Sequence, residues 1–408
     1  MQRYCIVVAT LLLTACAAAA QVPERVQYVS DIDSWRVEVF AGVVHPRTVL
    51  QGPIGEAGFQ EPIQMCFLPS GEGLITTGGV IMLLKDRTVR YFAGVPGRPG
   101  YQDGPAEQAL LGQQLSICPD GKGGAYIGDR SNRCIRRLTH KAGRWVVETV
   151  AGDPKKTASE LQLTRVRDEG ELAPAPKSDV IDGVGKEARF SYLHANVIAD
   201  TAGNAYVIDS DFLRRITPQG QVETLNPRGG TGAPAGLREP LDSAHFRLIM
   251  GGGICFGGDG NIYVADRWNH SLRKVDLRNR VVTVAIGPGL ATGPGHGYID
   301  GPEKEASFHD SPGHIVWDPY RKRFYTNGVD DWGLRTWENG SMKTIAGGGR
   351  INTAVQSPAR LAGMHWCGVL AVDPRPPHDI YIWSNHANWK GRIGRLFQVS
   401  GAQTGGGR

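Results

Sequence analysis

The segment "GNAYVIDSDFLRRIT" (Gly203 to Thr217) decides the fold because the chain repeats it. A near copy, "GNIYVADRWNHSLRKVD", spans Gly260 to Asp276, and a third, "GGAYIGDRSNRCIRRLT", spans Gly123 to Thr139. Weaker versions follow at Arg323 to Glu338 and at Asp379 to Phe397. Self-similarity at a period of tens of residues is typical of proteins built by stacking one supersecondary unit.

A second motif precedes each copy. It reads D-G-P-x-x-x-A-x-F and is clearest in "YQDGPAEQALL" (Tyr101 to Leu111) and "YIDGPEKEASF" (Tyr298 to Phe308). Its alanine recurs at steps of 52, 79, 56, 62 and 56 residues, which predicts six units and one long insertion: Ala57, Ala109, Ala188, Ala244, Ala306 and Ala362.

Each unit holds four short apolar segments bounded by Gly, Asp and Asn, which is typical of strands. In the third unit they are "ANVIAD" from Ala195, "AYVID" from Ala205, "LRRIT" from Leu213 and "QVETL" from Gln221. Four-stranded sheets repeated around an axis form a propeller. We therefore predict an all-β, six-bladed β-propeller of four-stranded antiparallel blades.

The two ends of the chain indicate how the ring closes. The sixth unit ends at "GRLFQVSGAQ" (Gly394 to Gln403) without a fourth strand, whereas "WRVEVFAG" (Trp35 to Gly42) is a fourth strand that precedes the first unit. We expect this N-terminal strand to pair beside Arg395 and complete the last blade.

These motifs resemble the NHL-repeat family of β-propellers, through the "AG" strand ends, the DG-P turn, G-N-x-Y-V-x-D and N-x-x-[IL]-R. The resemblance extends from about Trp35 onward. It weakens in the first unit, where "GEGLITTGG" (Gly71 to Gly79) lacks the aspartate, in the fifth, where Asn327 replaces it, and in the sixth, with the insertion "PRPPHD" and the segment "WSNHANW". It implies an exported bacterial protein whose propeller serves as an interaction module.

The first 20 residues have the pattern of a secretory signal, with Arg3, an apolar stretch and then small residues. Two ways of processing this signal are possible from the sequence. Signal peptidase would cleave before Gln21, whereas a lipobox at residues 13–16 would leave a lipidated Cys16. We expect a periplasmic or outer-membrane-anchored protein, otherwise a secreted one, with no transmembrane segment. A linker at 21–34, one propeller at 35–400 and a flexible tail at 401–408 follow.

The net charge of +5 is mild and favours no nucleic-acid partner. A monomer is expected. Cys66, Cys118 and Cys255 share one repeat position, and we interpret them as small buried apolar side chains.

Carboxylates and arginines recur within the repeat itself. Asp129, Asp209 and Asp266 each end a second strand, and an arginine follows in the third strand at Arg136, Arg214, Arg273 and Arg335. We interpret them as structural charge-assisted pairs that also bind turn amides, rather than as a ring of ligand-binding carboxylates.

Histidines gather at the predicted start of the first strands, where loops converge on the channel. They are His194, His309, His314 and His365. Imidazoles from different blades could bind a metal or act as general bases, with His194, His314 and His365 as ligands of zinc, or with calcium as the ion. The alternative is that each is a hydrogen-bonding turn residue.

The loops between second and third strands carry the residues that differ most between units. The candidates for ligand binding there are Trp268, His270, Asp330, Asp331, Trp332 and Asn385. Tryptophans among carboxylates and amides are typical of glycan-stacking surfaces and of protein contacts, although aromatic residues that pack between blades would give the same pattern. The insertion at 153–180 is either a lid over the channel or a flexible surface loop.

Two functions follow. The first is a binding module for a protein, peptide or glycan at the channel face. The alternative is an extracytoplasmic, metal-assisted lyase or hydrolase that uses the histidines.

Overall fold

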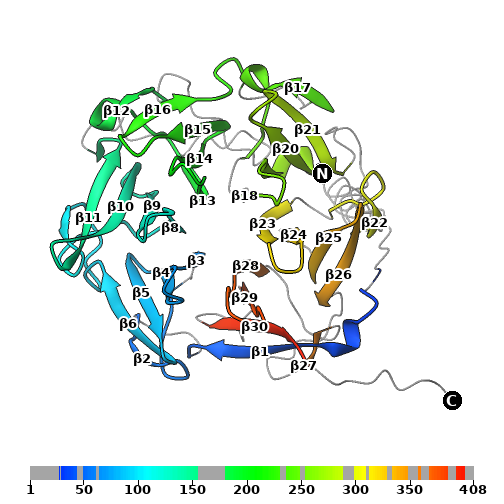
Figure 1. Ribbon diagram of the computed structural model, residues 1–408, viewed down its shortest axis with the longest axis horizontal. Coiled ribbons are helices and arrows are strands. Elements are labelled where there is room, and N and C mark those ends of the chain that lie inside the picture. Colours follow the sequence, from blue (N-terminus) through cyan, green and yellow to red (C-terminus); the bar gives the residue numbers. More distant parts are fainter. Residues whose placement is uncertain are drawn as a thin grey trace, which may run out of the picture.

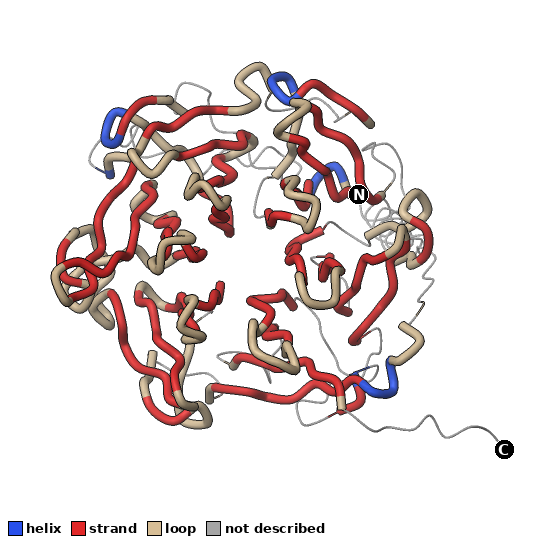
Figure 2. The backbone as a smooth tube through the Cα atoms, in the orientation of Figure 1, coloured by secondary structure: helices blue, strands red, loops and turns tan. Residues whose placement is uncertain are grey.

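The computed structural model describes residues 27, 29–43, 49–60, 64–154, 180–229, 236–248, 253–287, 298–308, 312–328, 333–347, 357–359, 367–384 and 392–399. These residues form six antiparallel sheets around a central axis (Figure 1). The tube in Figure 2 shows that the helical segments of this part are short turns at the rim and in loops. The prediction of a six-bladed, all-β propeller is confirmed.

The first three blades follow one another along the chain. Blade one has β2 (Gly52–Pro53), β3 (Gln64–Phe67), β4 (Gly73–Thr77), β5 (Val80–Lys85) and β6 (Thr88–Ala93). Blade two has β7 (Gly104–Pro105), β8 (Leu115–Pro119), β9 (Ala125–Asp129), β10 (Cys134–Lys141) and β11 (Arg144–Ala151). Blade three has β12 (Gly183–Val184), β13 (Leu193–Ala199), β14 (Ala205–Asp209), β15 (Phe212–Ile216) and β16 (Gln221–Thr224).

The last three blades complete the ring. Blade four has β17 (Arg238–Pro240), β18 (Ile254–Phe256), β19 (Ile262–Asp266), β20 (Ser271–Asp276) and β21 (Val281–Ile286). Blade five has β22 (Gly301–Pro302), β23 (Pro312–Asp318), β24 (Arg323–Gly328), β25 (Gly333–Glu338) and β26 (Ser341–Gly347). Blade six has β27 (Ser357–Pro358), β28 (Cys367–Val372), β29 (Ile380–Ser384) and β30 (Ile393–Gln398), to which β1 (Trp35–Ala41) is added.

Each blade carries a fifth strand that the sequence analysis did not predict. The Gly-Pro of the D-G-P motif pairs with the outer strand of its own blade, as in β7, where Gly104 faces Val147 and Pro105 faces Val146. Proline has no N–H to donate, so it is suited to an edge strand. A two-residue edge is also too short to template pairing with another chain.

The glycine of each "AG" strand end has a backbone reason. Gly94, Gly152 and Gly287 have φ of +89°, +95° and +102°, a region that residues with a side chain rarely adopt. A Cβ added to Gly94 would lie 2.8 Å from the carbonyl oxygen of Gly79. At these three positions the chain therefore needs a glycine to leave the outer strand for the next blade.

The ring closes through β1, as predicted. β1 runs antiparallel beside β30 (Figure 1). Glu38 of β1 lies directly opposite Arg395 of β30. Arg395 Nε donates to Glu38 Oε1 at 2.8 Å, and its Nη1 donates to Asp379 Oδ2 at 3.0 Å. The first described strand of the chain thus completes the last blade without a covalent link.

Residues just before β1 fasten to blade five. The N–H of Gln27 donates to Asp300 Oδ2 at 2.8 Å. The N–H of Val29 donates to the carbonyl oxygen of Thr344 at 3.1 Å, and the N–H of Thr344 donates to the carbonyl oxygen of Gln27 at 2.9 Å. Val29 is buried in the same apolar cluster as Trp35. The short turn η1 (Ile32–Ser34) precedes Trp35, and Trp35 Nε1 donates back across it to Asp31 Oδ2 at 3.1 Å. The closure therefore spans blades five and six.

The apolar core is divided into clusters between neighbouring blades. Cys66, Cys118 and Cys255 are buried in three of them, which confirms their predicted packing role, and burial raises the pKa of each thiol. In the described residues, no helix has the length and apolar character needed to cross a bilayer. Most of the insertion, residues 155–179, lies outside the described residues, as do the leader and residues 400–408.

Candidate functional site

One face of the ring is formed by two kinds of loop. Neighbouring strands of a blade are antiparallel. The segment that enters the innermost strand of a blade therefore lies on the same face as the loop between the second and third strands of that blade. Backbone hydrogen bonds join the two, from Arg130 N to Gln114 O at 3.1 Å in blade two and from Ser210 N to Tyr192 O at 2.8 Å in blade three. We call this the channel face.

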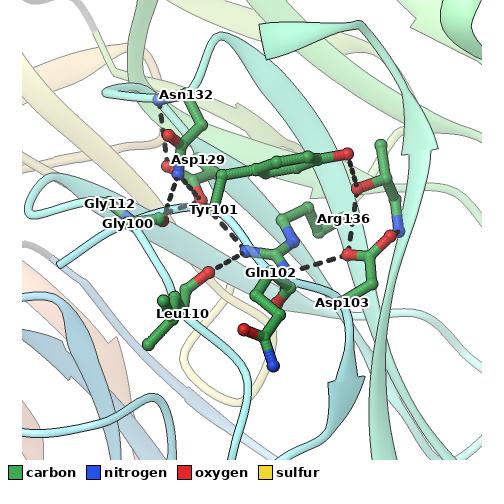
Figure 3. Close-up of polar contacts among 10 residues, drawn as sticks. Gly100, Tyr101, Gln102, Asp103, Leu110, Gly112, Asp129, Asn132 and Arg136 are labelled. Carbon is green, nitrogen blue, oxygen red and sulfur yellow. Dashed lines mark hydrogen bonds and ion pairs between the residues drawn. The ribbon is translucent and has the colours of Figure 1, made fainter. Parts of the chain in front are cut away.

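The repeated carboxylates and arginines lie beneath the channel face, and blade two shows their arrangement (Figure 3). Arg136 is fully buried and lies 3.4 Å from Asp129 Oδ2. Its Nη2 donates to Asp103 Oδ1 at 2.7 Å, and its Nη1 donates to the carbonyl oxygen of Leu110 at 2.6 Å. Asp129 Oδ2 accepts a hydrogen bond from Asn132 Nδ2 at 2.8 Å.

The same arrangement recurs in the next two blades. Arg214 Nη1 donates to Asp209 Oδ2 at 2.7 Å, and Asp209 Oδ1 accepts from the N–H groups of Ser191 and Tyr192. Arg273 Nη1 lies 3.5 Å from Asp266 Oδ2. The predicted structural pairs with turn amides are therefore confirmed for Asp129, Asp209 and Asp266.

An acidic residue at the outer edge of the blade is a second partner that the sequence analysis missed. In three blades it is the aspartate of the D-G motif, and in blade four it is Glu239 at the glycine position. Each buried arginine also contacts the acidic residue at the outer edge of its own blade, at distances of 2.7–3.0 Å: Asp103, Asp182, Glu239 and Asp300. In blade five, where Asn327 replaces the strand-two aspartate, Arg335 Nε donates to Asp300 at 2.9 Å. The arginines thus tie the outer edge of a blade to its centre.

Blade one reaches the same fold without the ion pair. Met82 occupies the position of the arginine and is fully buried, and Thr77 occupies that of the aspartate. Thr77 Oγ1 accepts the N–H of Gln60 at 2.7 Å, as Asp209 accepts that of Ser191. A hydroxyl and a thioether can therefore replace the pair.

Of the four candidate histidines, His314 is the one whose side chain the structure describes. It lies on β23, and its ring is 6.1 Å from that of Trp383 on the neighbouring blade, edge to face. His309 and His365 lie outside the described residues, and His194 is placed in β13 with its side chain outside them. Within the described residues, no three His, Cys, Asp or Glu side chains form a metal-binding group. The zinc or calcium site stays a prediction.

Acidification is expected to destabilise the protein partly through His314. Burial lowers the pKa of His314 to about 4 from the 6.5 of an unfolded chain. Between these values the unfolded state binds more protons, so the free energy of unfolding falls as pH drops from 6.5 towards 4. The side chain keeps some solvent exposure, so we expect about 1–2 kcal/mol. Urea titrations at pH 7 and 4.5 should show this loss reduced in His314→Gln and unchanged in the exposed His140→Gln.

The ligand candidates between second and third strands are described in part. His270 ends the turn η6 (Arg267–Asn269) in the left-handed conformation, with φ of 49°. Trp268 lies in η6 with its side chain outside the described residues. Asp330, Asp331, Trp332 and Asn385 lie outside them altogether. Ligand binding by these six residues stays a prediction.

Arg130 is a channel-face residue that the sequence analysis missed. It follows the repeated Asp129 in the loop of blade two, and its guanidinium carbon lies 4.0 Å from the ring centroid of Tyr192, in the loop that enters blade three. A cation over an aromatic face is attracted by the ring, which also fixes the plane of the guanidinium. Within the described residues, the side-chain N–H groups of Arg130 form no hydrogen bond.

The electrostatic surroundings of Arg130 differ from those of the repeated arginines. Its guanidinium is half-buried, and within the described residues it forms no ion pair. Burial lowers its pKa to about 10, so the group remains charged at neutral pH. A partly desolvated cation without an acidic partner favours a bound anion.

A buried carboxylic acid lies further round the same face. Asp211, in the loop of blade three, accepts the N–H of Leu248 from blade four at 2.9 Å and is 1% exposed. Burial raises its pKa to about 6. The channel face thus places a stacked cation and a titratable acid on neighbouring blades.

The described sheets, joined around one channel, define the class of protein as a six-bladed β-propeller. Residues 252–275, which include β18 and β19, match the NHL repeat. The chain is therefore a six-bladed β-propeller that contains a segment matching the NHL repeat, the family that its motifs resemble. A comparison with curated protein sequences gives no match.

Solved structures share the fold at low sequence identity. A protein of unknown function from Bacteroides thetaiotaomicron matches with a TM-score of 0.58 and 16% identity, over 89% of this chain and 75% of that one. Auxiliary nutrient binding proteins from Bacteroides thetaiotaomicron and Bacteroides ovatus match with TM-scores of 0.58 and identities of 15% and 13%, each over 89% of this chain and 76% of theirs. These similarities establish the fold.

Proposed function

We propose that the protein is a binding module whose channel face takes a ligand that carries a carboxylate. The observation that carries this proposal is the half-buried guanidinium of Arg130, stacked on Tyr192 without an ion-pair partner in the described residues. A stacked guanidinium presents a rigid, planar set of donors that matches a carboxylate. Peptide ends and acidic glycans both supply such a group.

Two further points support binding over catalysis. The repeated carboxylates Asp129, Asp209 and Asp266 are occupied by arginines and backbone amides, so they are not available as acids or bases. Fold neighbours include proteins described as auxiliary nutrient binding proteins. A propeller that binds a small organic acid is consistent with both.

A matched panel tests the proposal by isothermal titration: glucuronate with glucose, glutamate with glutamine, and citrate with glycerol. At least one acid should bind saturably, and its neutral counterpart at least ten-fold more weakly. Arg130→Gln should raise the Kd of that acid by about ten-fold or more, because a hydrogen bond to a charged group contributes about 1.5–3 kcal/mol. Arg144→Gln, in a hairpin on the opposite face, should leave it unchanged. Acids that bind no better than their neutral counterparts, or undiminished binding by Arg130→Gln, would contradict the proposal.

Export from the cytoplasm is part of the proposal, and it rests on the signal pattern of residues 1–20. The mass of the protein recovered from its native host should correspond to a chain that begins at Gln21 or at a lipidated Cys16. A chain that retains Met1 to Ala20 would exclude export by this signal.

A further inference from the structure

Blades six and one are neighbours in the ring (Figure 1). Two hollows lie at the seam between them, on the face opposite to the channel face. The larger, of about 630 Å³, is lined mainly by apolar side chains and turn residues, among them Phe67, Leu68, Pro69, Val372 and Pro374. The smaller, of about 380 Å³, is lined mainly by charged side chains from both blades. Hollows of this size are typical of small-molecule sites.

Arg375 belongs to both hollows and forms the partition between them. It comes from the extended turn between β28 and β29 and reaches across the seam to blade one. Its guanidinium carbon lies 5.7 Å from the ring centroid of Phe67, and its Cδ lies 3.8 Å from the position of a Cβ on Gly71. The apolar hollow and the charged hollow therefore adjoin at one cation.

The charged hollow has an aromatic wall and mostly paired ions. Phe40 and Tyr381 meet edge to face with centroids 4.8 Å apart. Arg395 is held by Glu38 and Asp379, and Lys85 pairs with Glu72 at 2.8 Å.

Two guanidinium groups in the charged hollow can be reached by a ligand. Arg375 donates Nε and Nη2 to Asp373, at 2.9 and 2.8 Å, and its side chain is 59% exposed. Arg87, exposed at the tip of the β5–β6 hairpin, has no side-chain partner among the described residues. A ligand that places an anionic group here meets donors from both blades.

We propose that these adjoining hollows form a second ligand site, for a small carboxylic acid with an apolar body. The carboxylate lies at Arg375 and Arg87, and the apolar body fills the larger hollow beside Phe67 and Leu68. The site is independent of the channel face and of the function proposed for it. Because its walls come from blade one and from the blade that β1 completes, a bound acid also bridges the seam of the ring.

Isothermal titration of the full chain with three probes tests this site: 3-phenylpropionate, 3-phenylpropanol and acetate. The first has both the acid and the apolar body, and each of the others lacks one of them. We expect saturable binding of 3-phenylpropionate, and binding at least ten-fold weaker for each of the other two. The melting temperature should rise with 3-phenylpropionate alone, since a ligand of the folded state stabilises it.

Variants locate the bound probe. Arg375→Gln and Arg87→Gln should each raise the Kd of 3-phenylpropionate five-fold or more. Arg87 is exposed and unpaired in the described residues, so its replacement should leave the fold intact, and weaker binding by Arg87→Gln cannot be due to unfolding. Arg144→Gln in the matching hairpin of blade two, and Arg130→Gln on the channel face, should not change the Kd. No saturable binding, equal binding of the alcohol, or binding indifferent to both Arg375 and Arg87 would overturn the proposal.

Discussion

Trp35→Ala is expected to lower the free energy of unfolding by about 3–5 kcal/mol, the usual cost of emptying a buried tryptophan site. Trp35 is 1% exposed and begins β1, the strand that closes the ring. It packs in the same cluster as Val29, Leu334, Ile380 and Leu396, so its loss weakens contacts between the chain's first strand and blades five and six. Urea unfolding followed by circular dichroism measures the change.

Leu237→Ala provides the control for Trp35→Ala. Leu237 is apolar but 57% exposed, so its removal should change the free energy of unfolding by about 0.5 kcal/mol or less. If Trp35→Ala is no more destabilising than Leu237→Ala, β1 does not hold the last blade.

Asp209→Ala is expected to cost about 3–5 kcal/mol, because it leaves the fully buried Arg214 without its closest carboxylate. It also removes the acceptor for the N–H groups of Ser191 and Tyr192. Chemical denaturation of the purified variant measures this loss.

Blade one supplies the matched control for the buried pair. It carries Thr77 and Met82 at the positions of Asp209 and Arg214 and folds in the same way. The double variant Asp209→Thr with Arg214→Met should therefore be less destabilised than the sum of the two single variants, by about 1–3 kcal/mol of coupling. If the effects of the two single variants add, Asp209 and Arg214 do not stabilise the blade as a coupled pair, which would contradict this account.

Much of the fold could be predicted because each blade carries the same strand and turn motifs. The D-G-P and G-N-x-Y-V-x-D motifs fixed the number of blades, and the unpaired strand at Trp35 to Gly42 predicted the closure at Arg395. The fifth strand could not be predicted in this way. Its two residues are too few to show an alternating pattern, and Gly104–Pro105 looks like a turn until its partner in β11 is known.

The candidate site was harder to predict, since it depends on contacts between blades. Arg130 stands one position after the repeated Asp129, where the motif carries no signal, and Tyr192 comes from the next blade. Arg375 belongs to the irregular segment "PRPPHD", which the repeat does not describe, and it contacts Phe67 near the other end of the chain. The pattern of a single blade indicates its strands but not which side chains of two blades meet.

A designed disulfide tests the closure of the ring most directly. Glu38 of β1 lies opposite Arg395 of β30. The Cα atoms of such antiparallel partners are about as far apart as the Cα atoms of two disulfide-bonded cysteines. In Glu38→Cys with Arg395→Cys, mass spectrometry of the oxidised protein should find the peptides of residues 38 and 395 linked. Glu38→Cys with Arg215→Cys, the equivalent position in blade three, should remain unlinked. Absence of the 38–395 link, or equal linking in both variants, would contradict the account.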